Sequence, residues 1–348
     1  MKPGRTLDLS CVVKVATAGV LCLGVVGAVT AAPATEVVAG PEEAARANWR
    51  TFMSQNPASE EGCFQASYPS FVWEKMECKA ASPRVHPVRR VPKTGAPEVT
   101  GNGNDYVAQA AGLISKTLGT FPKVTGVTSE KSVGVAAFGG GGILGPNEYS
   151  LQINTNFTGT TAACAGHSGC TVWQQFIYAP DYQFNGQAAV FMQYWLIGWG
   201  SSACPRSWMS AGGGDCFRNS AIAAAPDMPI TSLAKLTLSG QAVAGGNDTV
   251  VFNNGTQAFS MTGKDSVVDI SAVWTQSEFN IVGNAGGSRA QFNSGSSVTV
   301  KVALTDGSTA APRCVAGAGS TGETNNLNLG SCTASSGTTP SIQFTESN

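Results

Sequence analysis

The stretch CTVWQQFIYAPDYQFNGQAAVFMQYWLIGW, residues 170–199, decides the fold that we expect for this chain. It holds three of the seven tryptophans, and it places glutamines inside runs that are otherwise aromatic and aliphatic. A buried amide without a partner costs on the order of 1–3 kcal/mol. The glutamines of this stretch must therefore bond to neighbouring groups or face a cleft. They are Gln174, Gln175 and Gln193.

Outward from this stretch, a β pattern runs from about residue 104 to the end of the sequence. Short runs rich in Val, Ile, Thr, Tyr and Phe alternate with Gly, Asn and Ser. Residues 105–118 also have apolar side chains at helical spacing, so a helix is the alternative there. The pattern predicts an all-β domain over 104–348, a two-sheet antiparallel β-sandwich of the lectin-like jelly-roll type. The expected strands are 106–114, 121–127, 132–138, 148–157, 171–178, 188–197, 233–239, 248–252, 256–261, 266–271, 277–282, 298–304 and 341–345.

Residues 1–31 have the pattern of a secretory signal peptide, with a basic start, an apolar run and a small-residue cleavage site. We therefore expect a secreted protein, extracellular or periplasmic, with no membrane association after export. Without these residues, the formal charge changes from −1 to −3. Charged residues are sparse, and no basic face favours nucleic acid as a partner. We expect a monomer.

Eight of the ten cysteines follow the predicted signal peptide, and an even number in an exported chain indicates disulfides. Short loops favour local pairing, although eight cysteines allow 105 pairings. A zinc site is the rival interpretation, but the chain has no CxxC and only two histidines, so we expect no metal and no cofactor. The expected pairs are Cys63–Cys78, Cys164–Cys170, Cys204–Cys216 and Cys314–Cys332.

Residues 32–103 differ from the rest and predict an N-terminal prosegment or linker region. Residues 41–53 can form a short amphipathic helix, and residues 62–78 form a small segment closed by Cys63–Cys78. Residues 82–97 hold four prolines and five basic side chains, so we expect an extended linker there. The more specific alternative is a removable propeptide whose basic side chains cover an acidic site.

The sequence lacks a usable set of the catalytic residues that the common classes of hydrolase require. Serine-type catalysis needs a histidine base, yet His86 lies in the proline-rich segment and His167 in the tight Cys164–Cys170 loop. What remains is carboxylate and amide chemistry. Glu278 is the main candidate because strand alternation places it on one face with Gln276 and Asn280. A carboxyl group in such a cleft can have a raised pKa, although a solvated sheet face would give the same pattern.

The order of several segments resembles the glutamic peptidases (the eqolisin family), which are secreted β-sandwich acid proteases. GTFPKVTGVTS (119–129) resembles the opening strands of the family, and CTVWQQFIY (170–178) resembles the strand that carries its catalytic glutamine. SEFNIVG (277–283) resembles its Glu-Trp-Ile-Val-Glu signature. The resemblance covers roughly residues 104–305. Its other matching segments are NEYSLQIN (147–154), AVFMQYWL (189–196) and GSRAQFNSGSSVTV (287–300).

The resemblance implies a Glu/Gln pair that activates water for peptide-bond hydrolysis. Glu278 falls on the catalytic glutamate, and the glutamine is Gln175 or Gln174, of which Gln175 is favoured because it shares a face with Trp173. The expected substrate-binding residues are Trp173, Gln193, Trp195 and Gln276. The sequence departs from the family signature at two positions, where Phe279 replaces its Trp and Gly283 replaces its second Glu. Residues 198–232 form an insertion relative to the family.

The sequence thus predicts a secreted acid endopeptidase, made as a zymogen, that acts on polypeptide. The alternative is a non-catalytic, lectin-like carbohydrate- or surface-binding sandwich in which Trp195, Trp199 and Trp208 stack on sugars. A glycosidase is the third possibility. It requires two carboxyl groups about 5 to 9.5 Å apart, and the pattern offers no second acid to pair with Glu278.

Overall fold

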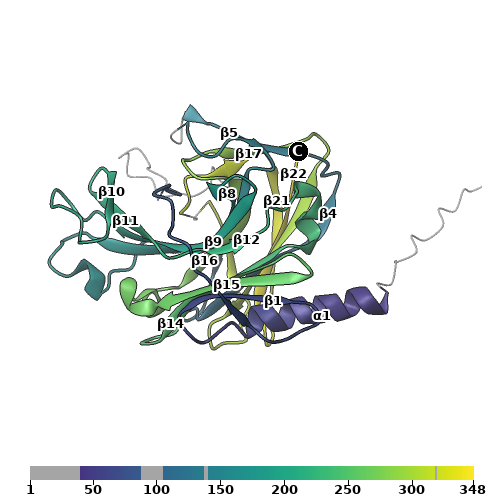
Figure 1. The fold of residues 1–348 in the computed structure, drawn as a ribbon, viewed down its shortest axis with the longest axis horizontal. Helices are drawn as coiled ribbons and strands as arrows, with labels where there is room; N and C mark the ends of the chain where they lie inside the picture. The colour runs from purple at the N-terminus through teal and green to yellow at the C-terminus, as the bar shows by residue number, and fades with distance from the viewer. Residues whose placement is uncertain (1–39, 88–104, 137–139, 318–319) are drawn as a thin grey trace, which may run out of the picture. The chain divides into compact units, whose positions relative to one another are not determined.

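The computed structural model describes residues 40–87, 105–136, 140–317 and 320–348 (Figure 1). The predicted signal peptide lies outside these residues, as does most of the expected linker. The described residues form a two-sheet antiparallel β-sandwich, so the expected fold class is confirmed. No helix among them is long and apolar enough to cross a membrane.

The strands of the described residues form three sheets, which we number 1 to 3; sheets 1 and 2 are the two layers of the sandwich. Sheet 1 has the order β2 (Glu74–Met76), β1 (Gly62–Ser67), β15 (Gln257–Lys264), β14 (Asn247–Asn253), β13 (Thr237–Gln241), β4 (Lys116–Thr125), β18 (Ser297–Thr305), β22 (Ser341–Ser347) and β21 (Asn328–Ser335). Sheet 2 has the order β10 (Met209–Gly212), β11 (Asp215–Asn219), β9 (Gln187–Ile197), β8 (Thr171–Phe184), β7 (Tyr149–Thr155), β16 (Gln276–Gly283), β3 (Tyr106–Gln109) and β19 (Arg313–Ala316), and β12 (Ala223–Ala225) also pairs with β9. Sheet 3 is small, and it joins β20 (Thr324–Asn325), β17 (Arg289–Phe292), β5 (Glu130–Val133) and β6 (Gly145–Pro146).

Aromatic side chains fill the space between sheets 1 and 2. Tyr178 of β8 stacks on Phe252 of β14 with ring centroids 3.8 Å apart, and Phe279 of β16 packs on Phe121 of β4. Gly119 makes room for this packing, since a Cβ there would lie 2.2 Å from the Phe279 ring. Even-numbered residues of β8 and odd-numbered residues of β16 therefore face sheet 1, and their neighbours face the opposite side of sheet 2.

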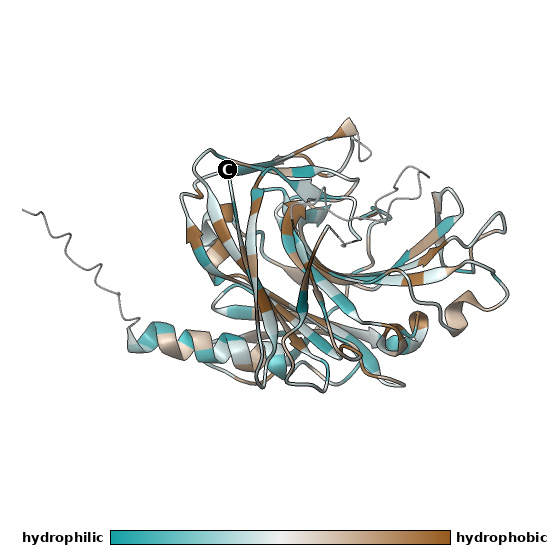
Figure 2. Cartoon of the chain, turned by 180° about the vertical axis from the view of Figure 1, so that it is seen from behind, coloured by the Kyte–Doolittle hydropathy of each residue, from teal (hydrophilic) through white to brown (hydrophobic). Residues whose placement is uncertain are grey.

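The N-terminal segment is part of the sandwich. The predicted helix is present as α1 (Pro41–Gln55), and Figure 2 shows hydrophilic and hydrophobic residues alternating along it. Its apolar side packs Trp49 and Met53 against Val251 of β14. The segment closed by Cys63–Cys78 does not stand apart, because β1 pairs with β15 along its whole length. All four expected disulfides are present.

Several expected elements differ from the structure. The strand expected at 266–271 is wrong, because two 3₁₀ turns occupy it, η5 (Asp265–Val267) and η6 (Ile270–Ala272). The Asp265 carboxylate accepts bonds from the backbone N–H and the hydroxyl of Ser271, which favours a turn over a strand. The helical alternative for 105–118 is also wrong, since β3 and β4 lie there. Two further 3₁₀ turns are η3 (Ala162–Cys164) and η4 (Ile230–Lys235), and η4 replaces the start of the strand expected at 233–239.

The predicted insertion at 198–232 contains three strands that the sequence pattern did not indicate. β10 and β11 form a hairpin at the edge of sheet 2, where β11 pairs with β9, and Cys204–Cys216 ties the loop before the hairpin to β11. The insertion therefore widens the sheet that carries the candidate site.

Candidate functional site

A row of polar side chains crosses the face of sheet 2 that points away from sheet 1. The strand registers pair each member with the next, in the order Glu278, Asn154, Gln175, Gln193 and Asn219, on β16, β7, β8, β9 and β11. Directly opposed residues in antiparallel strands point to the same face. We call this set the polar row. All of its members except Asn219 are buried.

The two candidate glutamines lie on opposite faces of β8. Gln174 points into the core, where its Nε2 donates to Asp248 Oδ2 of β14 at 2.9 Å. Gln175 belongs to the polar row with Glu278. No hydrogen bond between described residues joins Gln175 to Glu278, because Asn154 of β7 stands between them. Their strands are therefore separated by about 10 Å, which is two strand spacings.

A continuous chain of hydrogen bonds fixes the amides of this face. Asn219 Oδ1 accepts from Gln193 Nε2 at 2.6 Å, and Trp195 Nε1 donates to both Gln193 Oε1 and Gln175 Oε1, at 3.2 and 3.1 Å. Gln175 Nε2 then donates to Gln152 Oε1 at 3.1 Å. These bonds explain how glutamines can lie inside apolar strands without the cost of unpaired amides. They also hold the Gln175 amide in one orientation.

Residues 82–87, which we call the strap, lie across the same face of sheet 2 and belong to no helix or strand. Side chains of the polar row hold its backbone: Asn219 Nδ2 donates to Ser82 O at 2.8 Å, and Gln193 Nε2 donates to Arg84 O at 3.2 Å. Gln193 Oε1 accepts from the His86 N–H at 2.8 Å. Further bonds come from Tyr182 Oη to Arg84 O, from Gly286 N to Val85 O and from Gly322 N to Pro87 O.

Two strap side chains enter the face. Val85 packs on the buried cluster of Trp173, Trp195 and Phe217. His86 is 0% exposed, and its Nδ1 lies 3.0 Å from Gln152 Nε2. Burial lowers the pKa of His86 to about 3, so its ring is neutral and Nδ1 accepts the amide proton.

The other predicted substrate-binding residues have separate positions. Trp173, Gln193 and Trp195 lie under the strap, where Trp173 and Trp195 are 0% and 1% exposed. Gln276 pairs instead with Gln109 of β3, and its Nε2 donates to Gln109 Oε1 at 2.7 Å. The structure therefore brings three of the four together.

At the other end of the polar row, Glu278 is enclosed by acidic and neutral groups. Its Oε2 accepts from Ser320 N at 3.0 Å, and the buried carboxyl group of Asp105 is near enough for its charge to act on Glu278. Burial, with the nearby charge of Asp105, raises the pKa of Glu278 well above its usual range. The expectation that no second acid pairs with Glu278 is wrong, since Asp105 precedes β3, which pairs beside Glu278 on β16.

Glu323 is a third buried carboxyl group on this face. Its Oε2 accepts from Thr321 Oγ1 at 2.6 Å, and its Oε1 lies 3.6 Å from His86 Nδ1. Burial raises the pKa of Glu323 to about 7. Thr321 Oγ1 also lies 3.1 Å from Gln152 Oε1, so the hydrogen-bond chain of the amides continues to Glu323.

Gly283 explains one departure from the glutamic-peptidase signature. A Cβ at this position would lie 2.3 Å from the carbonyl carbon of Ser288 and 2.4 Å from its oxygen. A glutamate therefore does not fit at Gly283 without movement of the backbone. Any second acid of this site must come from elsewhere in the chain, and Asp105 and Glu323 are the described residues that supply one.

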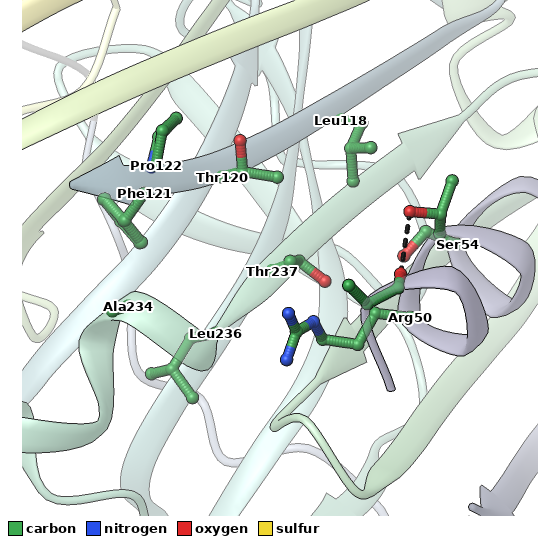
Figure 3. A pocket seen from close by; sticks show the side chains of 11 residues that line it. Arg50, Ser54, Leu118, Thr120, Phe121, Pro122, Ala234, Leu236 and Thr237 are labelled. Carbon is green, nitrogen blue, oxygen red and sulfur yellow. Dashed lines mark hydrogen bonds between the residues drawn. The ribbon is translucent and has the colours of Figure 1, made fainter. Parts of the chain in front are cut away.

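A pocket of about 270 Å³ lies elsewhere, between α1 and sheet 1 (Figure 3). Arg50 and Ser54 of α1 line it, together with Leu118, Phe121 and Leu236. The Arg50 guanidinium is already paired with Glu43. The pocket has no carboxyl group in its lining, so it offers no acid–base pair. Among the described residues, no group of three or more His, Cys, Asp or Glu is arranged to hold a metal ion.

Comparisons with known proteins do not identify a family. No family model, no curated protein and no solved structure matches the chain.

Sequence reasoning missed six residues described above, which are His86, Asp105, Gln152, Asn154, Asn219 and Glu323. Gln152 could have been found, because it alternates with Asn154 on a predicted strand beside the one that carries Gln175. His86, Asp105 and Glu323 come from segments outside the predicted strands, and only the tertiary fold brings them to sheet 2.

Proposed function

We propose that this chain is the latent form of a secreted acid endopeptidase of the glutamic type. Glu278 takes a proton from the attacking water and later returns it to the leaving amine. Gln175 orients this water and donates to the oxyanion that develops on the scissile carbonyl. For this, the water and the carbonyl must enter between the two side chains, above Asn154, after the segments that bury them have moved. Secretion rests on the signal-like residues 1–31 and on four disulfides, which persist in oxidising compartments.

The strap is the single observation that carries this proposal. A polypeptide segment already lies over the Gln193 and Asn219 end of the polar row, and these two amide side chains bond its carbonyl and N–H groups. Such main-chain bonds are the usual way for a protein to hold an extended peptide. They support a peptide as the substrate, and they support latency, because the strap must leave before a substrate can enter.

The sugar-binding alternative has less support. Stacking on a sugar requires an accessible aromatic face, whereas Trp195 is 1% exposed and Trp199 stacks on His167 with ring centroids 3.3 Å apart. A glycosidase also has less support, because its two carboxyl groups must leave room for a glycosidic bond, whereas Asp105 and Glu278 are 1% and 2% exposed.

The test uses the purified full chain, incubated between pH 2 and 6 with a denatured protein substrate. We expect cleavage that begins after a lag, as the strap is released, and that resists inhibitors of serine, cysteine and metal-dependent peptidases. If the denatured substrate stays intact across this pH range, both with the strap intact and with the strap removed by a trace of another protease, the peptidase proposal fails. The carbohydrate- or surface-binding sandwich then takes its place.

A further inference from the structure

The strap lies between two sets of groups that bond its backbone. From one side, polar side chains of sheet 2 bond backbone groups of residues 82–86. From the other side, Gly286 N donates to Val85 O at 2.9 Å. Gly322 N donates to Pro87 O at 2.7 Å, and a Cβ at Gly322 would lie 2.8 Å from the same oxygen, so the close approach needs glycine. Because these bonds go to the main chain, they suit other peptides as well.

Val85 marks an apolar subsite of this groove. Its side chain packs on the buried cluster of Trp173, Trp195 and Phe217. Trp173 and Trp195 lie on the long central strands β8 and β9, whereas Phe217 lies on β11, within the insertion 198–232. The insertion therefore supplies one wall of the apolar subsite, and an aliphatic side chain fills it.

His86 marks a second subsite, in which its ring is completely enclosed. The ring centroid lies 5.8 Å from that of Tyr182 and 6.0 Å from that of Phe191. At the polar edge of the ring, Nδ1 lies 3.0 Å from Gln152 Nε2 and 3.6 Å from Glu323 Oε1. A leucine side chain has a similar size, but it would offer the Gln152 amide no acceptor. The second subsite therefore favours histidine.

The direction of the strap relates these subsites to the proposed catalytic pair. Ser82 is bonded from β11, Arg84 from β9 and the His86 ring from β7. The next strand of sheet 2 is β16, which carries Glu278. A peptide that lies in the same direction as the strap therefore brings the peptide bonds that follow its histidine toward Glu278.

We propose that this groove, once the strap has left it, binds peptides in which an aliphatic residue directly precedes a histidine. Phe217 and Gln152 determine the specificity, Phe217 for the aliphatic residue and Gln152 for the histidine. That such peptides are cleaved on the C-terminal side of the histidine rests on the proposed function. Their binding does not.

The test uses the full chain with Val85→Ser and His86→Ser, which we call the opened chain because its strap fills neither subsite. Its ligand is a fluorescent synthetic peptide with the sequence of residues 82–87, and anisotropy measures the affinity. Val85→Asp or His86→Leu in the peptide should weaken binding by about 10-fold or more, through lost apolar burial or an unpaired amide. Arg84→Ala in the peptide is the matched control, since Arg84 is exposed, and it should change the affinity by less than about threefold.

Equal affinity of these peptides, or no binding of the wild-type peptide, would overturn the proposal. If the opened chain does not fold, the full chain with His86→Ala alone replaces it, because one subsite is then empty. Phe217→Ala in the opened chain should remove the preference for valine over aspartate in the peptide. Phe184→Ala, at a side chain that is 57% exposed on β8, should keep this preference. A preference that survives Phe217→Ala would also overturn the proposal.

Cleavage sites distinguish this inference from the proposed function. In a denatured protein digested by acid-activated wild type, we expect cuts to be enriched just after Val-His, Ile-His and Leu-His pairs. Cleavage that requires Glu278 but shows no such enrichment, with equal affinity for all the peptides, would overturn the inference alone. Selective binding of the peptides by a protein that cleaves none of its substrates would overturn the proposed function alone.

Discussion

Glu346 offers the sharpest test of how the buried carboxyl groups affect stability. It lies on β22, is 0% exposed, and accepts bonds from the side-chain amides of Asn280 and Asn325 at 3.3 Å. Burial raises its pKa from 4.5 to about 8. The group is therefore protonated in the folded protein at pH values where it is ionised in the unfolded chain.

The sign and size of the effect follow from proton linkage. Because the folded protein binds the extra proton, the free energy of unfolding is highest below about pH 4.5 and falls as the pH rises toward 8. Each pH unit corresponds to about 1.4 kcal/mol, so Glu346 alone lowers stability by at most about 3 kcal/mol between pH 4.5 and 7. Glu346→Gln removes this loss and keeps one amide oxygen as an acceptor.

We expect Glu346→Gln to be more stable than the wild type by about 1–3 kcal/mol at pH 7 and within about 1 kcal/mol of it at pH 4. Urea unfolding of the oxidised protein at pH 4, 5.5 and 7 measures this difference, and Glu60→Gln on the exposed surface is the control. A difference between wild type and Glu346→Gln that is the same at pH 4 and pH 7 would refute the reasoning.

Three further predictions concern other parts of the chain. Gln174→Leu removes a donor from the buried Asp248 carboxyl group and should lower the free energy of unfolding by about 2–3 kcal/mol, while the folded protein keeps its activity. Gln175→Leu should lower the rate by about 10²–10³-fold, and a rate loss in Gln174→Leu with none in Gln175→Leu would mean that Gln174 is the catalytic glutamine. Ser54→Ala should raise the free energy of unfolding by up to about 1 kcal/mol, because the buried Ser54 hydroxyl at the α1 pocket (Figure 3) has no hydrogen-bond partner among the described residues. Thermal unfolding measures this change, and a lower melting temperature in Ser54→Ala would contradict it. N-terminal sequencing of the secreted, active protein should find a cut within 82–103, and a fully active uncut chain would argue against a prosegment.

Much of the fold could be predicted from the sequence because it depends on local pattern. The spacing of the cysteines in short loops was sufficient for all four disulfides, and the apolar spacing of residues 41–53 was sufficient for α1. The edge strands β10, β11 and β12 were not predictable in this way. They are short and lie in a segment rich in Gly and Ser, so their pairing with β9 depends on the rest of sheet 2.

The faces on which the candidate residues lie could be predicted from the sequence, but the distances between those residues could not, because they depend on the order of the strands. Alternation along β8 separates Gln174 from Gln175, and alternation along β16 places Glu278 away from the core. Which strands lie between Gln175 and Glu278 depends on the sheet order, and this order inserts β7 with Asn154. The position of Asp105 near Glu278 depends on the pairing of β3 with β16 across more than 160 residues of sequence, which no local pattern encodes.

The most direct test of the central claim is the activity of Glu278→Gln against a denatured protein after acid activation, measured beside the wild type. Glu278→Gln keeps the shape of the side chain and removes the group that takes the proton, so we predict that cleavage is abolished. The free energy of unfolding at pH 4 should stay within about 1 kcal/mol of the wild type, which excludes misfolding as the cause. A Glu278→Gln protein that cleaves at the wild-type rate would contradict the account.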